Sequence, residues 1–574
     1  MRTKAEVLEV TEADKTIEMI RQLKGADNRT DEERNAEIPY PFKRGTKGGL
    51  FLIGKEKADG TQDTKLVCRD LPVIIRKLMH VERSEVFYEL YWRADGREQR
   101  EIIPALSIST RSEIIKLADR NLAVNDGNVK ELIRYFDLFQ SINHIPTAYA
   151  VDRLGLVKGH FIHPLLTDDV EIMPPDLGEK QALEAFAVKG TSSQWMENIF
   201  NKVREHPKAL TVTLASFTSV ILHDLNLSPS IVDMSGSTSR GKTTALRVAA
   251  TVWGKPDGLV NEWNATRVSI ERKNAWLNSF PALYDDTMKA NPKQLQDVIY
   301  NFSGGKSKGR GSVKGSQIEY TWRSMMISTG ENSLLEYAEA GGAAARVLPL
   351  TGLPFGEEAD HIYFRSLYDA LGEYYGQIGI DFLKQWKARK SELIGLYHGY
   401  KNQFQTLAGE NQVLARVALH YGAIVFTAHL LNEFFNAEIN LDLFTDLYKE
   451  IKRENKAIDK PLQRLEQVLS ELDRDRAAIY YEDDARPNIP IAALYNKGVL
   501  YLMPDYLEKK LGPEVRAIRE EWRRRGITST FERNGKEVDY IQKWHVDKNI
   551  RSIPINQETI KEMGFDFSRK SKTW

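Results

Sequence analysis

GSTSRGKT, residues 236–243, lies between an apolar run at 228–235 and a helical pattern at 244–253. A strand that leads into a glycine-rich turn and then a helix directs backbone N–H groups and the positive helix end at one point, which suits a chain of phosphates. The spacing fits the P-loop pattern GxxxxGK(S/T), so we expect Lys242 to reach the β- and γ-phosphates of ATP and Thr243 to bind Mg²⁺. A chance glycine turn before a helix is the alternative. The residues expected to hold the nucleotide are Gly236, Ser237, Thr238, Ser239, Arg240, Gly241, Lys242, Thr243 and Thr244.

The length and composition favour a soluble protein with several domains. A chain of 574 residues is too long for one core. Its 80 basic and 80 acidic residues balance, so only local clusters of charge can point to a nucleic-acid partner. The single cysteine, Cys68, excludes internal disulfides and fits a small buried side chain in a reducing cytoplasm. The longest apolar runs, 209–222 and 417–431, fall short of the roughly 18 to 20 residues that span a bilayer, so no membrane partner is expected.

The first third of the chain predicts a peripheral arm and an α+β domain. Residues 1–45 are charged and carry little apolar periodicity. The stretch 85–103 alternates apolar and polar side chains around Asp95-Gly96, which indicates a hairpin. Helices are expected after Thr110, whose spacing to Glu113 fits a capping box, and at 128–139. Acidic residues and two prolines make 167–180 the expected linker.

A pair of carboxylates follows the P-loop at a useful distance. In FPALYDDT, residues 280–287, an apolar strand precedes Asp285 and Asp286, and Asp285 comes 43 residues after Lys242. That separation leaves room for one helix and one strand. We expect Asp285 to join Thr243 around Mg²⁺ and Asp286 to orient or activate the attacking water, as in a Walker B motif. A strand that ends in a solvated acidic turn is the alternative.

A glycine-rich basic segment precedes the next strand. Lys306, Lys308, Arg310 and Lys314 lie among glycines before SMMIS, residues 324–328, and this pattern indicates a hairpin able to lie along DNA phosphates. A solvated charged loop is the alternative, although in ring motors a hairpin in this place projects into the central pore. Thr329 follows the strand, where its hydroxyl could detect the γ-phosphate as a sensor 1 residue.

An arginine precedes the next apolar strand. Arg346 stands in GGAAARVLPL, residues 341–350. It could be a charge at the edge of the core, but in ring ATPases an arginine in this place reaches the nucleotide of the neighbouring subunit and neutralises charge in the transition state. Such a role requires an oligomer.

The C-terminal region predicts a winged helix. Its pattern is strand, helix, helix and a hairpin that turns at Asn534-Gly535. Lys and Arg outnumber Asp and Glu between 509 and 551, which favours contact with DNA phosphates or base edges. A winged helix that binds protein, or an extension of the lid with a solvated basic face, is the alternative. The candidate DNA-binding residues of the second helix are Arg519, Arg523, Arg524 and Arg525.

The order of these motifs carries a family resemblance. The P-loop, NATRVSIE (264–271), LYDD, the basic hairpin, ISTGE and AAAR together resemble the MCM-like AAA+ helicases of staphylococcal mobile elements, the cassette chromosome helicase (Cch) group and pathogenicity-island Rep initiators. The ATPase core of that family is catalogued as a domain of unknown function, and the resemblance covers roughly 180–430. It implies a hexameric, self-loading DNA helicase that uses ATP and Mg²⁺ and moves 3′ to 5′.

The resemblance also implies residue roles. Lys242 and Thr243 would form Walker A, Asp285 and Asp286 Walker B, Thr329 sensor 1, Arg346 the finger and Arg416 sensor 2. For Arg416, a helix-capping or surface arginine is equally consistent. Two departures stand out. Asp286 occupies a position where many AAA+ proteins have Glu, and 254–284 is too short for the additional helix-2 hairpin of MCM proteins, so DNA contact would rest on the hairpin at 303–315.

The expected fold class is α/β, an AAA+ P-loop ATPase core with a helical lid, preceded by an α+β domain and followed by a winged helix. The expected function is replicative helicase of a mobile genetic element; an ATP-switched origin-binding initiator without motor activity, or an AAA+ protein remodeller, is the alternative. Expected partners are single-stranded DNA in the pore, duplex or origin DNA on the winged helix, further copies of the chain, and a primase, polymerase or accessory replication protein. The expected domains are an arm at 1–45, the α+β domain at 46–180, the ATPase core at 181–352, the lid at 353–457 and the winged helix at 458–574.

Overall fold

The structure is a computed structural model. It describes residues 30–568 except 57–59, 61, 238–240, 310, 313–314, 317–318, 338–344, 410, 455–459, 482–489, 534–535 and 546–547. The chain divides into two compact units, residues 1–153 with 157–173, and residues 154–156 with 174–574. The division after 173 falls within the stretch 167–180 that the sequence marks as a linker. Most of the expected N-terminal arm lies outside the described residues.

The first unit contains two larger sheets and one long helix. An antiparallel sheet is formed by β1 (Phe42–Arg44), β2 (Leu50–Glu56) and β3 (Gln62–Cys68). A mixed sheet has the order β10-β7-β4-β5-β6. Its strands are β4 (Val73–His80), β5 (Val86–Ala94), β6 (Arg97–Pro104), β7 (Thr147–Val151) and β10 (Val170–Ile172). The apolar face of α4 (Val129–Ile142) packs into the core of this unit and confirms the helix expected at 128–139.

Two local predictions for this unit have different outcomes. The hairpin at Asp95-Gly96 is confirmed, since both residues have positive φ (51° and 76°), as a two-residue type I′ turn requires. The helix expected after Thr110 is only one turn long, α3 (Arg111–Ile114), and continues as the 3-10 helix η2 (Ile115–Arg120). The Thr110 side chain makes no capping hydrogen bond, so the expected capping box does not form.

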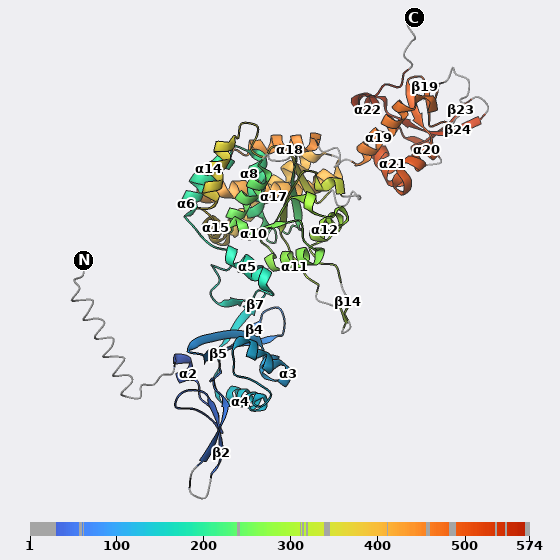
Figure 1. The fold of residues 1–574 in the computed structure, drawn as a ribbon. Coiled ribbons are helices and arrows are strands. Elements are labelled where there is room, and N and C mark those ends of the chain that lie inside the picture. The colour runs from blue at the N-terminus through green and yellow to red at the C-terminus, as the bar shows by residue number, and fades with distance from the viewer. Residues whose placement is uncertain are drawn as a thin grey trace. The chain divides into compact units, whose positions relative to one another are not determined.

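A parallel five-stranded sheet of order β12-β13-β16-β11-β17 organises the first part of the second unit. The strands are β12 (Val260–Glu262), β13 (Ala282–Asp285), β16 (Met325–Gly330), β11 (Ser230–Ser235) and β17 (Val347–Thr351). The residues of these strands are mostly apolar and buried, because helices such as α8 (Pro207–Ser219), α9 (Lys242–Thr251) and α17 (Gln412–Phe435) pack on the sheet (Figure 1). All five carboxyl ends therefore lie along one edge, and β16 separates the P-loop strand β11 from the carboxylate strand β13.

Helices precede and connect these strands. They are α5 (Leu177–Ala185), α6 (Ser192–Trp195), the π-helix η3 (Met196–Phe200), α7 (Asn201–Val203), α8 (Pro207–Ser219), α9 (Lys242–Thr251), α10 (Pro256–Leu259), α11 (Arg267–Leu277), η4 (Thr287–Lys289), α12 (Pro292–Gly304) and η5 (Leu334–Tyr337). The order P-loop strand, turn, helix that the sequence predicts is confirmed by β11 and α9.

Within the described residues, five α-helices lie between β17 and residue 454, over the stretch for which the sequence predicts a lid. They are α14 (His361–Leu371), α15 (Gln377–Leu393), α16 (Tyr397–Ala408), α17 (Gln412–Phe435) and α18 (Asp442–Glu454). In the part of the chain that the structure describes, α17 alone is long and apolar enough to cross a membrane by length and composition. Most of α17 is buried against α8 and α16, as in the central helix of a globular core. The apolar run at 417–431 is thus part of a longer helix than the sequence suggested.

The C-terminal region has its own core around Trp522, which is fully buried and donates Nε1–H to the carbonyl of Pro461 at 2.8 Å. A five-stranded sheet has the order β18-β19-β20-β24-β23. The strands β21 and β22 pair on either side of 534–535, as the sequence predicts, but they form a separate two-stranded sheet. A second hairpin, β23 with β24, belongs to the five-stranded sheet instead. The elements are α19 (Lys460–Arg474), β18 (Ile479–Tyr481), β19 (Ala493–Asn496), β20 (Val499–Leu502), α20 (Pro504–Leu511), α21 (Val515–Arg524), β21 (Phe531–Arg533), β22 (Lys536–Val538), β23 (Ile541–His545), β24 (Lys548–Ile555) and α22 (Gln557–Glu562).

Candidate nucleotide-binding site

The two glycines that bound the P-loop are required by its backbone. Gly236 follows β11 with φ +150°, and an added Cβ would lie 3.2 Å from the backbone of Gly352. Gly241 caps α9 with φ +88°, and its Cβ would lie 2.8 Å from the rings of Phe355 and Phe364. No other residue type fits either position without strain. Between them, Thr238, Ser239 and Arg240 lie outside the described residues.

Lys242 opens α9 and turns its side chain back over the loop. Its Nζ donates to the carbonyl oxygens of Gly236 at 2.8 Å and Ser237 at 2.7 Å. Burial lowers the pKa of Lys242, while the nearby carboxylates of Glu331, Asp285 and Asp286 act in the opposite direction. Among the described residues no side chain caps the first turn of α9, and Gly241 to Thr244 of this turn line one cavity with the Lys242 side chain. This arrangement suits a phosphate group.

The residues expected to handle the metal and the γ-phosphate meet at the carboxyl edge of the sheet. Thr243 donates its hydroxyl to the two carboxylate oxygens of Asp285 at 3.1 and 3.0 Å. Thr329, at the end of β16, donates to Oδ1 of the same carboxylate and accepts the backbone N–H of Asp286 at 3.3 Å. The structure therefore brings together three residues that come from α9, β13 and β16.

Asp286 stands beside this group in a left-handed backbone conformation, φ +65°. Its carboxylate accepts the N–H of Met288 at 3.3 Å and lies 3.7 Å from Nζ of Lys289. The same ammonium pairs with Glu262 at 3.0 Å, and the hydrogen bond to Glu262 together with the nearby acids raises the pKa of Lys289. The sequence analysis missed Lys289, although its place three residues after Asp286 was a usable signal.

These residues line a cavity of about 400 Å³ that also has an aromatic wall. Phe364 and Tyr368, one helical turn apart on α14, face the cavity beside Gly241 and Thr244. The hydroxyl of Thr244 lies 3.4 Å from the hydroxyl of Tyr368, and the Arg247 guanidinium lies over the same ring, 5.7 Å from its centroid. The helical period of α14 predicts no such role, because the sequence does not say which face meets the P-loop.

The donors fit a magnesium ion bound with a nucleotide. Mg²⁺ prefers hard oxygen ligands and is commonly held by one or two protein oxygens with phosphates and water. Thr243 and Asp285 offer a hydroxyl and a carboxylate that already lie within hydrogen-bond distance of each other at the cavity wall. Within the described residues no group of three or more His, Cys, Asp or Glu side chains could hold a metal on its own. Phosphate oxygens would therefore have to complete the shell.

Two arginines assigned from the sequence lie away from this cavity. Arg346 precedes β17, and its carbonyl accepts the N–H of Ile231 at 3.0 Å near the start of the parallel strand β11. Arg416 lies one turn before His420, whose Nε2 is 2.8 Å from the carbonyl oxygen of Ser228, just before β11. Gly236 follows the opposite end of β11, so neither arginine reaches the nucleotide cavity of its own chain. This placement gives no support to Arg416 as a sensor for that nucleotide.

The basic segment forms a hairpin, as the sequence predicts. β14 (Gly311–Ser312) pairs antiparallel with β15 (Gly315–Ser316), and β14 lies on a projection beyond α11 and α12 (Figure 1). Lys306 and Lys308 are exposed at its base, and Nζ of Lys306 lies 3.2 Å from Glu319. Arg310 and Lys314 lie outside the described residues. Contact of these four residues with DNA stays a prediction.

The four arginines assigned to the recognition helix are next to acidic side chains. Arg519 forms a two-point ion pair with Asp539 at 3.0 and 2.7 Å. Arg524 and Arg525 each lie 2.7 Å from Glu521, and these contacts hold the pKa of Glu521 at about 2. Arg523 lies 3.8 Å from Glu520. DNA binding by α21 stays a prediction, and it would require these ion pairs to be exchanged for phosphates.

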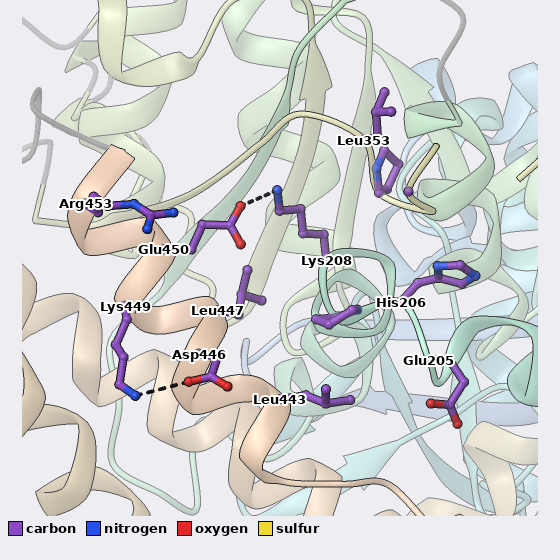
Figure 2. Close-up of a pocket in the computed structure, with 13 residues that line it drawn as sticks. Glu205, His206, Lys208, Leu353, Leu443, Asp446, Leu447, Lys449, Glu450 and Arg453 are labelled. Atoms are coloured by element: carbon purple, nitrogen blue, oxygen red, sulfur yellow. Dashed lines mark hydrogen bonds and ion pairs between the residues drawn. The ribbon is translucent and has the colours of Figure 1, made fainter. Parts of the chain in front are cut away.

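A larger cavity, of about 710 Å³, lies between the start of α8, the loop 353–356 and α18. Figure 2 shows that two of its lysines face acids: Lys208 pairs with Glu450 at 2.6 Å, and Lys449 with Asp446 at 3.1 Å. Its lining contains neither a P-loop residue nor the carboxylates at the sheet edge. The smaller cavity is therefore the candidate site, because it joins the phosphate donors to the metal ligands.

Comparison with known proteins agrees with this fold. A family described as a domain of unknown function (DUF927) matches residues 42–320. A solved structure described as SCCmec type IV Cch, an active helicase, is similar with a TM-score of 0.68 at 15% identity, covering 92% of this chain and 99% of that one. The apo NrS-1 C-terminal region gives a TM-score of 0.30 at 11% identity, with 84% and 96% covered. No curated protein sequence matches this chain significantly. The first likeness shows a shared mixed α/β fold over nearly the whole chain.

Proposed function

We propose that the protein is an ATP-driven DNA helicase of the MCM-like AAA+ type. The observation that carries this proposal is the meeting of Lys242, Thr243, Asp285 and Thr329 at the carboxyl edge of a parallel sheet, around a cavity with room for phosphates. Ligands bind at this edge in open α/β sheets because strand ends and helix N-termini converge there. The likeness in fold to a solved helicase supports the choice of motor over other ATPases.

Each side chain has a defined task in this proposal. Lys242 would give up its loop carbonyls for the β- and γ-phosphates, and Thr243 with Asp285 would hold Mg²⁺, which neutralises phosphate charge when bound. Thr329 keeps the Asp285 carboxylate in place. Asp286, whose carboxylate is 39% exposed, would accept a proton from the attacking water or orient it. Its short side chain would require the water to lie close to the end of β13.

The motor assignment draws on features outside the cavity. The hairpin of β14 and β15 carries exposed lysines at its base, as DNA phosphates require. Arg346 lies at the end of the sheet opposite its own P-loop, where a neighbouring copy could bring its nucleotide. We propose a hexamer that loads itself on DNA and moves 3′ to 5′ in the cytoplasm, serving the replication of a mobile element. A primase, polymerase or accessory protein would dock on the domain at 46–180.

The C-terminal region is proposed to be the winged helix. Apart from the strands β18, β19, β21 and β22, it has in chain order α19, β20, α20, α21 and the hairpin of β23 and β24, and β24 pairs with β20. That order of helix, strand, two helices and hairpin supports a winged helix, in which α21 would be the recognition helix.

Unwinding of forked DNA tests the proposal. The full-length protein is incubated with ATP, Mg²⁺ and a labelled fork that has a 3′ or a 5′ single-stranded tail, with Lys242→Ala as the control that lacks the phosphate-facing ammonium. We expect ATP-dependent strand separation on the 3′ tail and none with the variant. DNA binding without separation on either fork would favour the origin-binding initiator, and ATP turnover stimulated by an unfolded polypeptide but not by DNA would favour the remodeller.

A further inference from the structure

One helix, α12, contacts two features that the proposed motor needs to coordinate, and it begins close in sequence to a third. It starts at Pro292, six residues after Asp286, and it ends at Gly304, directly before the basic hairpin. A rigid helix transmits a displacement at one end to the other end. The contacts along α12 therefore decide what moves with the metal-side carboxylates.

The first contact is with Arg346. Its guanidinium lies over the ring of Tyr300, 5.5 Å from the centroid, and its Nη1 is 3.5 Å from Oγ of Ser303. Ser303 is buried, and its own hydroxyl donates to the carbonyl of Ile299 at 2.5 Å, so it accepts from the arginine. Tyr300 is 65% exposed. Such an exposed ring contributes little to the core, and it lies under the Arg346 cation.

The second contact is with the hairpin. Trp322, which follows the hairpin, is buried and donates Nε1–H to the carbonyl of Phe302 at 2.9 Å. The two rings stack with centroids 6.0 Å apart. The backbone N–H of Trp322 also bonds to the carbonyl of Gly305 at 3.1 Å, which ties both ends of the hairpin to the end of α12. Tyr300 and Phe302 are two residues apart, so the arginine and the hairpin are held by the same turn of helix.

We propose that Tyr300 is a positioning residue that holds Arg346 on α12 and thereby links the nucleotide of the neighbouring copy to the DNA hairpin. The inference rests on the proposed function, since it takes Arg346 to act in the neighbouring site. When Arg346 extends toward the neighbour's phosphate, the Tyr300 ring holds the position from which the side chain extends. A displacement of Arg346 is then transmitted through α12 to Trp322. The ring supplies the negative face that attracts the guanidinium, so the phenol hydroxyl is dispensable.

ATP turnover of the full-length chain, with and without single-stranded DNA, tests the inference. The variants are Tyr300→Ala, Tyr300→Phe, Arg346→Ala, the Tyr300→Ala/Arg346→Ala pair, and Tyr149→Ala as a control at a comparably exposed tyrosine, 55% against 65%. We expect Tyr300→Ala to lower DNA-stimulated kcat by about two- to fivefold, the effect of losing a cation–π contact at an exposed site, with KM for ATP and DNA affinity unchanged. Tyr300→Phe and Tyr149→Ala should behave as wild type.

The double variant separates a positioning role from a general loss of structure. If Tyr300 acts through Arg346, the pair turns over ATP no more slowly than Arg346→Ala alone. A Tyr300→Ala protein with wild-type stimulation, a Tyr300→Phe protein as impaired as Tyr300→Ala, or additive losses in the pair would overturn the inference and leave the helicase proposal standing. Wild-type protein whose turnover DNA does not stimulate would overturn the helicase proposal, and this inference with it.

Discussion

The hydroxyl of Thr329 donates a hydrogen bond to the carboxylate of Asp285 and so joins the carboxyl ends of β16 and β13. The same carboxylate accepts the hydroxyl of Thr243 from the first turn of α9. Because β16 lies between β11 and β13, Thr329 can touch the carboxylate of Asp285 and also line the cavity beside the P-loop residues. Loss of the γ-phosphate would therefore alter the position of the Asp285 carboxylate through Thr329 as well as through the metal.

Thr329→Val tests this relationship, because it keeps the shape of the side chain and removes the hydroxyl. A hydrogen bond to a charged group contributes about 1.5–3 kcal/mol, so we expect kcat for ATP to fall about 10- to 100-fold. Binding of a fluorescent ATP analogue should change little, because Lys242 and the loop remain. Thr329→Ser restores the hydroxyl and should recover most of the turnover. Equal turnover in the Val variant and the wild type would contradict a role for this bond.

Asp286→Asn separates the charge of Asp286 from its backbone conformation. Asn adopts the left-handed region nearly as readily as Asp, so the variant should keep the φ of +65° and fold normally. If the carboxylate accepts a proton from water, single-turnover hydrolysis should slow by about 10² to 10⁴-fold while ATP still binds. Asp286→Glu should retain more activity than Asp286→Asn. Hydrolysis by the Asn variant at the wild-type rate would assign water activation to another group.

The local motifs were readable from the sequence because each is contained in one strand and the turn after it. Gly236 to Thr243 and Asp285-Asp286 are such motifs, and their convergence follows from parallel strand ends at one edge. Contacts between distant segments were not readable. The Tyr300 ring under Arg346 joins residues 46 positions apart, and the aromatic wall of Phe364 and Tyr368 depends on how α14 crosses the P-loop. In each case packing decides which face of a regular helix meets the site.

The same limit explains the misjudged elements. Thr110 and Glu113 have the spacing of a capping box, but the threonine hydroxyl makes no capping bond, and a 3-10 helix replaces the expected α-helix. The charge count around α21 was correct, yet it could not show that Asp539 and Glu521 lie against those arginines. A count of Lys, Arg, Asp and Glu gives the net charge of a segment, whereas the fold decides which of its cations form ion pairs with acids.

The buried carboxyl of Asp233 predicts a pH-dependent stability. It lies in β11 and accepts the N–H of Leu334 at 2.8 Å and the hydroxyl of Ser333 at 3.0 Å, yet burial raises its pKa from 3.8 to about 7. The folded chain therefore binds this proton more tightly than the unfolded chain. The stabilisation is complete below about pH 4 and is lost as the pH rises towards 7.

Asp233→Asn should remove that dependence, because the amide is neutral at every pH. We expect the thermal midpoint of the wild type, measured relative to the Asn variant, to fall between pH 5 and pH 7.5 and then level off. The comparison cancels the titration of other groups that the two proteins share. Midpoints that run parallel across this range would show that Asp233 is ionised throughout.

The exposed lysines of the hairpin predict a salt-dependent loss of DNA affinity. For single-stranded DNA, each phosphate neutralised by a lysine contributes about 0.7 to the slope of log K against log salt. Lys306→Ala/Lys308→Ala should therefore reduce the slope by about 1.4 and weaken binding without changing turnover in the absence of DNA. Lys387→Ala, an exposed lysine of α15, is the control. An unchanged slope in the double variant would place the DNA contact elsewhere on the chain.

The aromatic wall of the cavity predicts where the nucleotide base lies. The α-phosphate side of a P-loop is marked by the residues that follow its lysine, and here Thr244 meets the hydroxyl of Tyr368 at 3.4 Å. A base that leaves the phosphates on this side would stack on Tyr368, a ring that lines the cavity and lies under the Arg247 guanidinium. Tyr368→Ala should then raise KM for ATP several-fold with kcat unchanged, since stacking stabilises bound substrate and transition state alike.

Tyr368→Phe keeps the ring and should retain the wild-type KM, and triphosphate without a base should bind both proteins equally. A Tyr368→Ala variant that binds ATP as tightly as the wild type would move the base to another wall of the cavity.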